Sequence, residues 1–375
     1  MFVHPVLHPL PPPQDLETKA VLRQLTLAHR FLGELKGKVS TIPNESILIN
    51  TLVLQEAKDS SAIENIITTH DELYKSLLFE HLFLNAAVKE VSRYAEALKT
   101  GFSQVKVQKL ITNQTILTIQ KILEQNDAGY RRLPGTKLIN EATREIVYAP
   151  PQDHDTIIAL MDNLIAFMND ESISELDPLI KMALVHHQFE TIHPFYDGNG
   201  RTGRILNILY LVQQGLLDIP ILYLSRFIIR RKADYYHYLQ QVRETSNWEP
   251  WLLYILQGVQ ETAIETIEII EQIRSLMQQY KQRLKQELGR IYSQDLLNNL
   301  FKHPYTKIEF LQKELEISRV TASRYLDLLV RHEFLYKEKI GKSNFYINLP
   351  LFKLLREGRS GHQVAQPILT HTDSG

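Results

Sequence analysis

Apolar residues recur at three- and four-residue spacing along most of the chain, which is the pattern of amphipathic helices packed on a core. The pattern holds from Leu16 to about Gly101 and returns near Thr112–Glu124. Across Arg131–Pro151 it gives way to two short strand-like runs around Asn140–Thr143, which predict a β-hairpin. The sequence therefore predicts a mainly α protein that carries one hairpin in its first half.

Capping residues mark two helices after the hairpin. Asp177-Pro178 combines an N-cap residue with proline at the first helical position, so we expect a helix from there to Ile192. A proline two residues later prevents this helix from continuing. A second helix is expected from near Gly200 to a C-cap at Gly215. The short segment between them is therefore predicted to be a helix–loop–helix junction.

The second half of the chain begins with a long helical pattern, in which apolar residues recur from Trp251 to about Leu288. Such a stripe either joins two domains or packs on a second subunit, and the sequence leaves both interpretations open. Residues 291–358 then show three helical segments followed by two strands that turn at Gly341. This order of elements resembles a winged helix.

The C-terminal segment is more basic than the rest of the chain. Residues 291–360 carry twelve Lys and Arg against eight Asp and Glu, a net charge of +4, whereas the whole chain has a net charge of −1. In a DNA-reading winged helix the third helix enters the major groove, and the start of that helix here carries Arg319, Thr321, Ser323 and Arg324. Because the charge excess is small, DNA is not the favoured partner, and a protein-binding role stays open.

Composition narrows the class of protein. The 375 residues are enough for two or three domains, and the absence of cysteine excludes disulfides, cysteine-ligated zinc and thiol nucleophiles. The sequence has no run of about 18 apolar residues, so no membrane span is predicted. Residues 1–15 hold five of the 16 prolines and indicate an extended arm rather than a secretory signal. We therefore expect a cytoplasmic protein that does not bind membranes.

The most informative chemistry lies in HPFYDGNGRTGR, residues 193–204. Asp197-Gly198-Asn199-Gly200 is typical of a turn, and it leads directly into a helix N-terminus whose free N–H groups and dipole attract anions. Arg201 and Arg204 lie on one face of the first helical turn, where two cations oppose the helix dipole. That arrangement makes sense if an oligophosphate binds there and bridges the N–H groups and the arginines.

Two side chains of this stretch carry metal or acid–base chemistry. Asp197 is a candidate ligand for Mg²⁺, which usually takes one or two carboxylates together with phosphate oxygens. His193, at the end of the preceding helix, is a candidate base that takes a proton from an attacking hydroxyl. His186 and His187 are expected to lie on a helix surface or to pack, and not to bind metal, because with His193 they give no standard zinc spacing.

The stretch resembles the signature of Fic-domain proteins, His-Pro-Phe-x-Asp/Glu-Gly-Asn-Gly-Arg-x-x-Arg, and matches it at every fixed position. A looser resemblance extends over about residues 40–260 and includes the hairpin. The resemblance implies a Fic-type helical bundle with a β-hairpin flap. It also implies an enzyme that transfers AMP from ATP to a hydroxyl of a target protein and releases pyrophosphate.

The resemblance also implies roles for the residues of the motif. His193 would be the general base, Asp197 would hold Mg²⁺ against the phosphates, and Arg201 and Arg204 would grip the β- and γ-phosphates. The anion hole and the remainder of the nucleotide-binding loop would be formed by Gly198, Asn199, Gly200, Thr202 and Gly203.

Two further groups of residues follow from the same resemblance. The hairpin is similar to the family's flap, which pairs with a target segment by strand addition, and its nucleotide-side backbone is expected at Ile146, Val147 and Tyr148. Tyr235 and Tyr236 resemble the tyrosine pair that borders the adenine pocket, although packing in an aromatic core is an equally good interpretation.

A second motif lies upstream, in KDSSAIENI. Ser60-x-x-x-Glu64-Asn65 is a common helix pattern on its own, but beside the Fic signature it resembles the family's inhibitory motif, Ser/Thr-x-x-x-Glu-Gly/Asn. The resemblance implies that Glu64 pairs with Arg204 and occupies the space of the γ-phosphate. Bound ATP would then present its α-phosphate wrongly for attack, and the chain would restrain itself.

Three functions are compatible with these motifs. The first is a protein adenylyltransferase whose partners are ATP, Mg²⁺ and a hydroxyl-bearing target protein, which includes the chain itself; a homodimer is a further option. The second is a Fic-type enzyme that removes AMP with the help of Glu64, or that moves another phosphate-containing group. The third is a DNA-binding regulator whose Fic core senses nucleotide.

The predicted domains follow from these assignments. An N-terminal helical region with the inhibitory helix spans residues 1–105, and the Fic catalytic core with its flap spans residues 106–250. A long helical connector over residues 251–290 leads to a winged-helix-like α+β domain over residues 291–358. Residues 359–375 are expected to be disordered.

Overall fold

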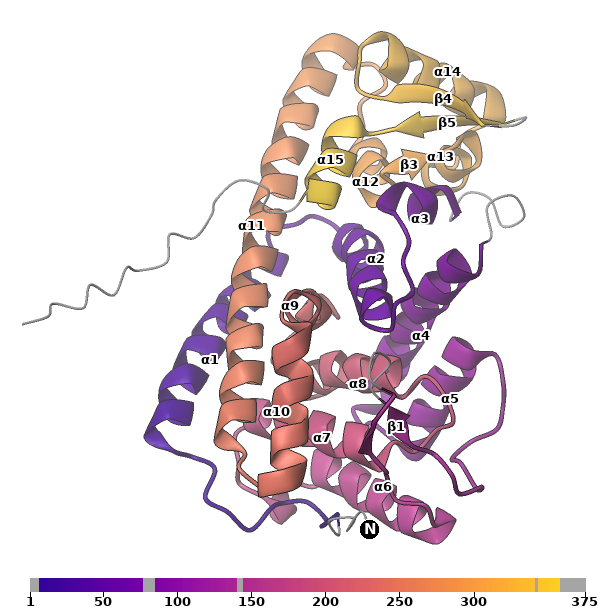
Figure 1. Cartoon of the computed structure of the whole chain (residues 1–375). Coiled ribbons are helices and arrows are strands. Elements are labelled where there is room, and N and C mark those ends of the chain that lie inside the picture. Colours follow the sequence, from indigo (N-terminus) through magenta and orange to yellow (C-terminus); the bar gives the residue numbers. More distant parts are fainter. Residues whose placement is uncertain (1–6, 77–84, 140–143, 341–342, 358–375) are drawn as a thin grey trace, which may run out of the picture.

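The computed structural model describes residues 7–76, 85–139, 144–340 and 343–357. The protein is mainly α-helical, as the sequence predicts (Figure 1). The first helices are α1 (Lys19–Val39), α2 (Glu45–Ile63), α3 (His70–Ser76), α4 (Ala86–Gln108) and α5 (Asn113–Glu124). The antiparallel pair β1 (Leu138–Ile139) and β2 (Ile146–Tyr148) follows, and forms the predicted hairpin. The stretch Asn140–Thr143, around which the strands were expected, lies outside the described residues.

The central helices follow the hairpin, and a long helix then joins them to a C-terminal unit. The central helices are α6 (His154–Asn169), the 3-10 helix η1 (Glu171–Ile173), α7 (Pro178–Ile192), α8 (Asn199–Gln213), α9 (Leu224–Arg230) and α10 (Lys232–Thr245). The long helix α11 (Glu249–Leu288) extends from these helices to the C-terminal unit (Figure 1). Its apolar stripe packs against α1, α7, α9 and α15, so this face is covered within the chain.

The C-terminal unit contains the three helices and two strands that the sequence predicts. Its elements are α12 (Gln294–Lys302), β3 (Tyr305–Thr306), α13 (Ile308–Leu315), α14 (Arg319–Arg331), β4 (Tyr336–Ile340), β5 (Ser343–Ile347) and α15 (Leu349–Glu357). The strands form an antiparallel sheet in the order β3-β5-β4. Sequence analysis missed β3, which is too short for a period-two pattern, and α15, which begins directly after a strand. The turn at Gly341 lies outside the described residues.

The C-terminal unit packs on the helices around the Ser60–Glu64 motif as well as on α11. Gln55 of α2 donates a hydrogen bond to the carbonyl of Leu355 in α15. The Tyr305 hydroxyl donates to Asp71 Oδ1 at 2.6 Å, and the Tyr305 ring stacks on Tyr74 of α3 with 5.9 Å between ring centroids. The unit is therefore attached directly to the helix that carries the motif.

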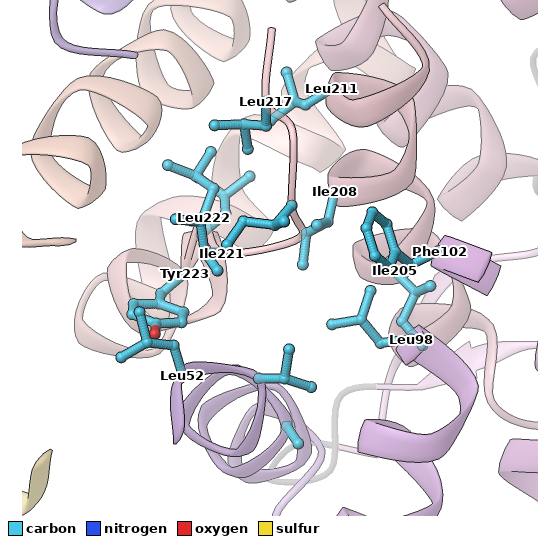
Figure 2. Close-up of a cluster of buried hydrophobic side chains, with 14 of the residues drawn as sticks. Leu52, Leu98, Phe102, Ile205, Ile208, Leu211, Leu217, Ile221, Leu222 and Tyr223 are labelled. Carbon is cyan, nitrogen blue, oxygen red and sulfur yellow. The ribbon is translucent and has the colours of Figure 1, made fainter. Parts of the chain in front are cut away.

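The helix pair α7 and α8 lies at the centre of the helical body. α7 is buried along its whole length from Leu179 to Ile192. Ile205 of α8 lies in one apolar cluster with Leu98 and Phe102 of α4 (Figure 2). Because both helices are packed on nearly every side, the loop that joins them, His193–Gly198, is held at a defined place.

Several predicted boundaries differ slightly from the structure. α4 continues to Gln108, past the predicted border at residue 105, and α11 begins at Glu249, before the predicted border at residue 251. Within the predicted arm, residues 7–15 form neither helix nor strand, and the Leu10 N–H donates to Asn163 Oδ1 of α6 at 2.7 Å. Residues 359–375 lie outside the described residues. None of the described helices is both long and apolar enough to span a bilayer.

The start of α7 gives a pH-dependent prediction. Asp177 caps α7 through the Leu179 N–H and accepts a 2.8 Å hydrogen bond from His29 Nε2 of α1, which raises the pKa of His29 against the effect of its partial burial. A raised pKa contributes stability below the ordinary pKa of histidine, and this contribution is lost as the pH rises through the raised value.

We expect His29→Gln to lower the free energy of unfolding by up to about 1 kcal/mol near pH 5.5 and by much less near pH 8.5, since the pair is partly exposed and screened. Thermal unfolding of both proteins at the two pH values measures the difference. An equal loss at both values would contradict the role of the ion pair.

Candidate active site

The loop between α7 and α8 is braced by Asn199. Its Oδ1 atom accepts the Phe195 N–H at 2.9 Å, and its Nδ2 atom donates to the Phe195 carbonyl at 2.9 Å. Gly198 is the N-cap residue of α8 and has a φ of 78°, a conformation that favours glycine. Asp197 is exposed, and its Oδ1 atom accepts the Gly198 N–H at 2.7 Å. Where the sequence predicts an anion hole, the structure has a rigid turn at a helix N-terminus.

The N-terminus of α8 faces a carboxylate from the end of α2. Over the described residues no side chain caps this helix, so its first N–H groups are left to another partner. A methyl group added to Gly200 would overlap with Glu64 Oε1, so the glycine is what lets the carboxylate approach. Glu64 therefore occupies a position where a helix N-terminus favours an anion.

Arg204 of α8 contacts both the Glu64 carboxylate and Ser60, one turn earlier in α2. Arg204 Nη2 lies 2.7 Å from Glu64 Oε1, while Arg204 Nε donates to Ser60 Oγ at 2.8 Å and Nη2 donates to the Ser60 carbonyl at 3.0 Å. The Arg204 side chain is only 2% exposed, whereas that of Glu64 is 36% exposed. The structure thus brings Ser60, Glu64 and Arg204 together, although 140 positions separate the two charged residues.

The two charges keep each other ionised. Burial would raise the pKa of Glu64, but Arg204 outweighs this effect and the pKa lies below its ordinary value. Burial would likewise lower the pKa of Arg204, but Glu64 raises it. The pair is therefore an ion pair at neutral pH, with one member buried and the other reaching solvent.

Asn65 has a backbone role in this arrangement. It follows Glu64, the C-cap residue of α2, and has the left-handed conformation, with a φ of 61°. The Ile66 N–H donates to the Ser61 carbonyl at 3.0 Å, which is the hydrogen bond of a Schellman ending. Glycine and asparagine are the residues that tolerate this conformation best, so asparagine suits the position after Glu64.

Arg201 has carboxylate partners that the sequence did not predict. Its Nη1 atom lies 3.0 Å from Glu90 Oε2 of α4, and its Nη2 atom lies 2.7 Å from Glu124 Oε1 of α5. The pKa of Glu124 lies above its ordinary value. Burial and the negative charges of Asp197 and Glu90 raise it by more than the Arg201 cation lowers it. Nothing in the local sequence distinguishes these two glutamates from solvated ones, so only the tertiary structure identifies them.

His193 is the C-cap residue of α7 and has a left-handed conformation, with φ 49° and ψ 60°. Burial and the cations Arg243 and Arg131 lower the pKa of His193 to about 4, against the opposing effects of the Glu190 backbone carbonyl and the Glu64 carboxylate. The imidazole is therefore neutral at physiological pH, which is the form that can accept a proton.

Arg243 connects the flap to the last turn of α7, because it contacts Tyr148 as well as Glu190 and Thr191. Tyr148 is buried, with the Arg243 guanidinium 4.2 Å above its ring centroid, while Ile146 is half-buried and Val147 is exposed. The β1–β2 ladder pairs Leu138 with Tyr148.

The two predicted adenine-pocket tyrosines differ in environment. The Tyr235 side chain is buried, its hydroxyl lies 3.0 Å from His186 Nε2, and its ring packs against Trp251. Tyr236 is 44% exposed. The surroundings of Tyr235 match the core interpretation, whereas the Tyr236 ring is partly exposed and contacts Tyr235 edge-on with 5.1 Å between ring centroids. His186 and His187 also pack in this aromatic core, as the sequence predicts.

Two other predicted nucleotide-loop residues lie on the inner side of α8. Thr202 is buried, and its N–H donates to the Gly198 carbonyl at 2.9 Å. At Gly203 a side chain would meet Glu190 Oε1 at 2.9 Å, so this glycine allows close packing of α8 on α7. Both residues shape the helix under the loop.

The residues present fit a Mg²⁺ ion that arrives with phosphates. Asp197 is an exposed carboxylate in the turn that leads into α8. Within the described part of the chain, no three His, Asp or Glu side chains surround a common point that could hold a metal on their own. This donor set suits Mg²⁺, which takes few protein ligands when phosphates and water supply the others.

Comparison with known protein families agrees with this geometry. The model described as "Fic/DOC family N-terminal" matches residues 22–103, and "Fic/DOC family" matches residues 110–211. The model "Protein adenylyltransferase SoFic-like, C-terminal domain" matches residues 276–351. The chain belongs to the Fic/DOC family.

Curated relatives match part of the chain at modest identity. "Protein adenylyltransferase Fic" from Drosophila erecta is 29% identical over 181 residues, which is 46% of this chain and 34% of that protein. "Protein adenylyltransferase fic-1" from Caenorhabditis elegans is 30% identical over 105 residues, which is 28% of this chain and 19% of that protein. The chain thus spans about a third or less of the length of these relatives.

Solved structures share the fold. A Fic family protein from Desulfovibrio desulfuricans G20 aligns with a TM-score of 0.57 at 19% identity, covering 90% of this chain and 98% of that chain. A Fic domain containing signaling protein from Bacteroides thetaiotaomicron VPI-5482 aligns with a TM-score of 0.53 at 21% identity, covering 64% and 97%. Fic-1 from C. elegans aligns with a TM-score of 0.52 at 19% identity, covering 67% and 73%.

The ending of α2 gives a prediction that separates backbone from side chain. Asn65→Gly and Asn65→Ala both remove the 3.3 Å hydrogen bond from Lys232 Nζ to Asn65 Oδ1, but only alanine resists the left-handed conformation. We expect Asn65→Ala to be less stable than Asn65→Gly by about 1 kcal/mol, because of the cost of this conformation for a residue with a Cβ atom. Chemical denaturation measures the difference, and equal stability of the two variants would contradict the backbone role.

Proposed function

We propose that this chain transfers AMP from ATP to a hydroxyl side chain of a target protein. The hydroxyl oxygen forms a bond to the α-phosphorus, the bond between this phosphorus and the bridging oxygen of the β-phosphate breaks, and pyrophosphate leaves. The proton of the hydroxyl passes to His193. The observation that supports the proposal is the junction of α7 and α8, where the neutral imidazole of His193 ends one helix and the uncapped N-terminus of the next helix carries two arginines.

The chain's own residues supply the positioning that such a transfer needs. Gly198, Asn199 and Gly200 present backbone N–H groups to the phosphates, and Arg201 and Arg204 balance their charge. Mg²⁺, held by Asp197 and phosphate oxygens, would neutralise further charge on the phosphates. Phosphoryl-type transfer depends mainly on such positioning and charge balance rather than on covalent chemistry by the protein.

The target segment would pair with the flap. β1 and β2 form a two-stranded ladder, and no other described strand pairs with either of them. A peptide that adds to an edge of such a ladder gains main-chain hydrogen bonds without a specific sequence. The hydroxyl-bearing residue of that peptide would then face His193, whether the peptide comes from another protein or from another copy of this chain.

Glu64 would hold the enzyme in an inactive state. Its carboxylate pairs with Arg204 at the N-terminus of α8, where the γ-phosphate would bind. A pair of charges about 4 Å apart is worth roughly 4 kcal/mol at an effective dielectric constant of about 20, before desolvation. Shifting a two-state equilibrium from 1:99 to 99:1 takes about 5.5 kcal/mol, so one ion pair supplies a large share of such a switch without being absolute.

Removal of this carboxylate gives the main test. We expect Glu64→Gly to raise self-labelling with α-labelled ATP at least about tenfold, because loss of about 1.4 kcal/mol of preference for the inactive state is sufficient. Glu64→Gln keeps the shape without the charge and is expected to give an intermediate rate. Intact-mass spectrometry identifies the added group as one adenylyl unit.

The matched control is Glu64→Gly/His193→Ala, which keeps the anion site open and removes the base. We expect no adenylyl group on this double variant or on lysate proteins incubated with it. Equal labelling by the wild type and Glu64→Gly would remove the inhibitory role, and labelling that survives loss of His193 would remove the proposed mechanism.

AMP removal is a second candidate function, which the state of Glu64 favours. Glu64 is ionised and its side chain is 36% exposed beside the anion site, so it can accept a proton from a water molecule that attacks an AMP-modified side chain. Incubation of a modified target without ATP separates the two functions. Release of AMP that depends on Glu64 supports removal, and an unchanged target supports transfer alone.

DNA binding by the C-terminal unit is not part of the proposal. A surface hollow of about 460 Å³ on α13 and α14 is lined by Arg319, Arg324 and Arg331, but also by Asp327. Arg319 is paired with Glu309 at 2.9 Å, and Lys337 is paired with Asp327 at 3.1 Å. These pairs reduce the positive charge available to a phosphate backbone.

We therefore expect little salt-sensitive binding to a DNA duplex. Fluorescence anisotropy with a labelled duplex at about 50 mM and about 200 mM salt measures the number of phosphates neutralised, and we expect a value near zero. A steep salt dependence that Arg324→Ala reduces would overturn this expectation and favour a DNA-binding regulator.

A further inference from the structure

Arg131 is a buried arginine between α5 and β1 that lies outside the Fic signature. Its Nε atom donates to the His193 carbonyl at 2.9 Å, and its Nη2 atom donates to the Ile192 carbonyl at 3.3 Å and to the Pro151 carbonyl. Its own backbone N–H donates to the Pro194 carbonyl at 2.9 Å. A single residue thus binds the end of α7, the start of the catalytic loop and the segment that follows β2.

Arg243 of α10 approaches the same helix end from another direction. Its Nη2 atom donates to the Glu190 carbonyl at 3.1 Å, and its Nε atom donates to Thr191 Oγ1 at 3.1 Å. Its guanidinium lies over the ring of Tyr148, the last residue of β2, at 4.2 Å. Like Arg131, it contacts both the last turn of α7 and the flap.

These contacts have two effects at the end of α7: they supply partners for its last carbonyls and hold the unusual backbone conformation of His193. The last carbonyls of a helix have no partner within the helix, and cations are favoured there by the helix dipole. In addition, His193 has a left-handed backbone, which costs a residue with a side chain on the order of 1 kcal/mol and persists only where surrounding contacts enforce it. Arg131 contacts the carbonyl of this very residue.

The same contacts tie the flap to the histidine. Arg131 precedes β1 and reaches the carbonyl of Pro151 after β2, so it holds both ends of the hairpin. Tyr196 adds to this link, because its hydroxyl accepts the N–H groups of Arg132 at 3.0 Å and Leu133 at 3.1 Å. The base of the flap and the loop after α7 are therefore bound directly to each other.

We propose that Arg131 and Arg243 are positioning residues that hold the His193 imidazole and the flap strand β2 in one fixed geometry. They set the distance between the proton acceptor and the target segment that pairs with the flap, without touching nucleotide or target themselves. This inference rests on the proposed function for its catalytic consequence, but its structural part concerns His193 alone.

Lysine and methionine at position 131 separate geometry from charge. Arg131→Lys keeps the positive charge but cannot span the same carbonyls, whereas Arg131→Met loses both. The charged groups that act on His193 are Arg131, Arg243 and Glu64. Burial is the largest cause of the low pKa of His193, followed by the cations Arg243 and Arg131. Loss of the Arg131 cation removes only the last of these, so we expect a small rise of the titration midpoint in the methionine variant and none in the lysine variant.

The first experiment is independent of activity. The His193 imidazole signal in heteronuclear NMR of the full chain with labelled histidine is assigned by its absence in His193→Ala. We expect this signal to shift in both Arg131 variants, and its titration midpoint to rise only in Arg131→Met. An unchanged signal and midpoint in a folded Arg131→Met variant would overturn the proposal, whether or not the chain proves to transfer AMP.

The second experiment measures the catalytic consequence in the Glu64→Gly background. We expect Arg131→Lys to lower the rate of self-labelling by about 100-fold, the effect of a misplacement of about 1 Å, with ATP affinity within about twofold. Arg243→Lys is expected to act in the same direction, which provides a second variant if one substitution prevents folding. Self-labelling of folded Arg131→Lys and Arg243→Lys at the rate of the parent would contradict the proposal.

Tyr130→Phe is the matched control. It removes a hydrogen bond of 2.6 Å to Asn113 in the same segment but keeps the ring that packs on Phe195, and it has no described contact with His193. We expect its labelling rate and its His193 signal to equal those of the parent. A loss as large as that of Arg131→Lys would mean that any change in this segment disturbs the site, and would overturn a specific role for Arg131.

Discussion

The N-terminus of α8 carries positive charge and favours a negatively charged partner. The carboxylates that supply this negative charge account for most of the arrangement of the site. The helix N-terminus has no side-chain cap among the described residues, and the first two helical turns add the positive charges of Arg201 and Arg204. Carboxylates from three other helix regions balance this charge, since Glu64 reaches Arg204 while Glu90 and Glu124 reach Arg201. A nucleotide's phosphates would meet the same requirement.

Of these carboxylates, Glu64 is the one best placed to exchange with a ligand. Its side chain is 36% exposed and belongs to the last turn of α2, whereas that of Glu124 is 13% exposed. The remainder of α2 is firmly held: Glu56 accepts hydrogen bonds from Tyr94 and Ser225, and Gln55 binds the C-terminal unit. The Glu64 carboxylate therefore sits at the C-terminal end of a helix that is held along its length, next to a unit whose own contacts reach that helix.

Sequence analysis captured the parts of the protein that depend on local chemistry. The capping pair at Asp177 and the glycine-rich turn predicted the helix–loop–helix junction, because caps and turns are encoded by adjacent residues. The resemblance brought Glu64 and Arg204 together across the chain. It did not reveal Arg131, Glu90 or Glu124, because an arginine before a hairpin or a glutamate on an amphipathic helix looks the same whether it faces solvent or a partner.

The short elements β3 and α15 were missed for a related reason, since two residues of strand and a helix that starts directly after a strand have no period of their own. The choice between a domain link and a subunit contact for α11 also required the structure. Its stripe is covered by α1, α7, α9 and α15, which periodicity alone cannot tell from a second chain.

The central claim is that Glu64 occupies the place of a terminal phosphate, and nucleotide affinity tests it most directly. Titration calorimetry of ATP and of AMP, each with the wild type and with Glu64→Gly in the presence of Mg²⁺, compares a ligand that needs this place with one that does not. The account predicts that Glu64→Gly binds ATP at least about tenfold more tightly, a gain of about 1.4 kcal/mol, with AMP affinity nearly unchanged. Equal gains for both nucleotides, or no gain for ATP, would contradict it.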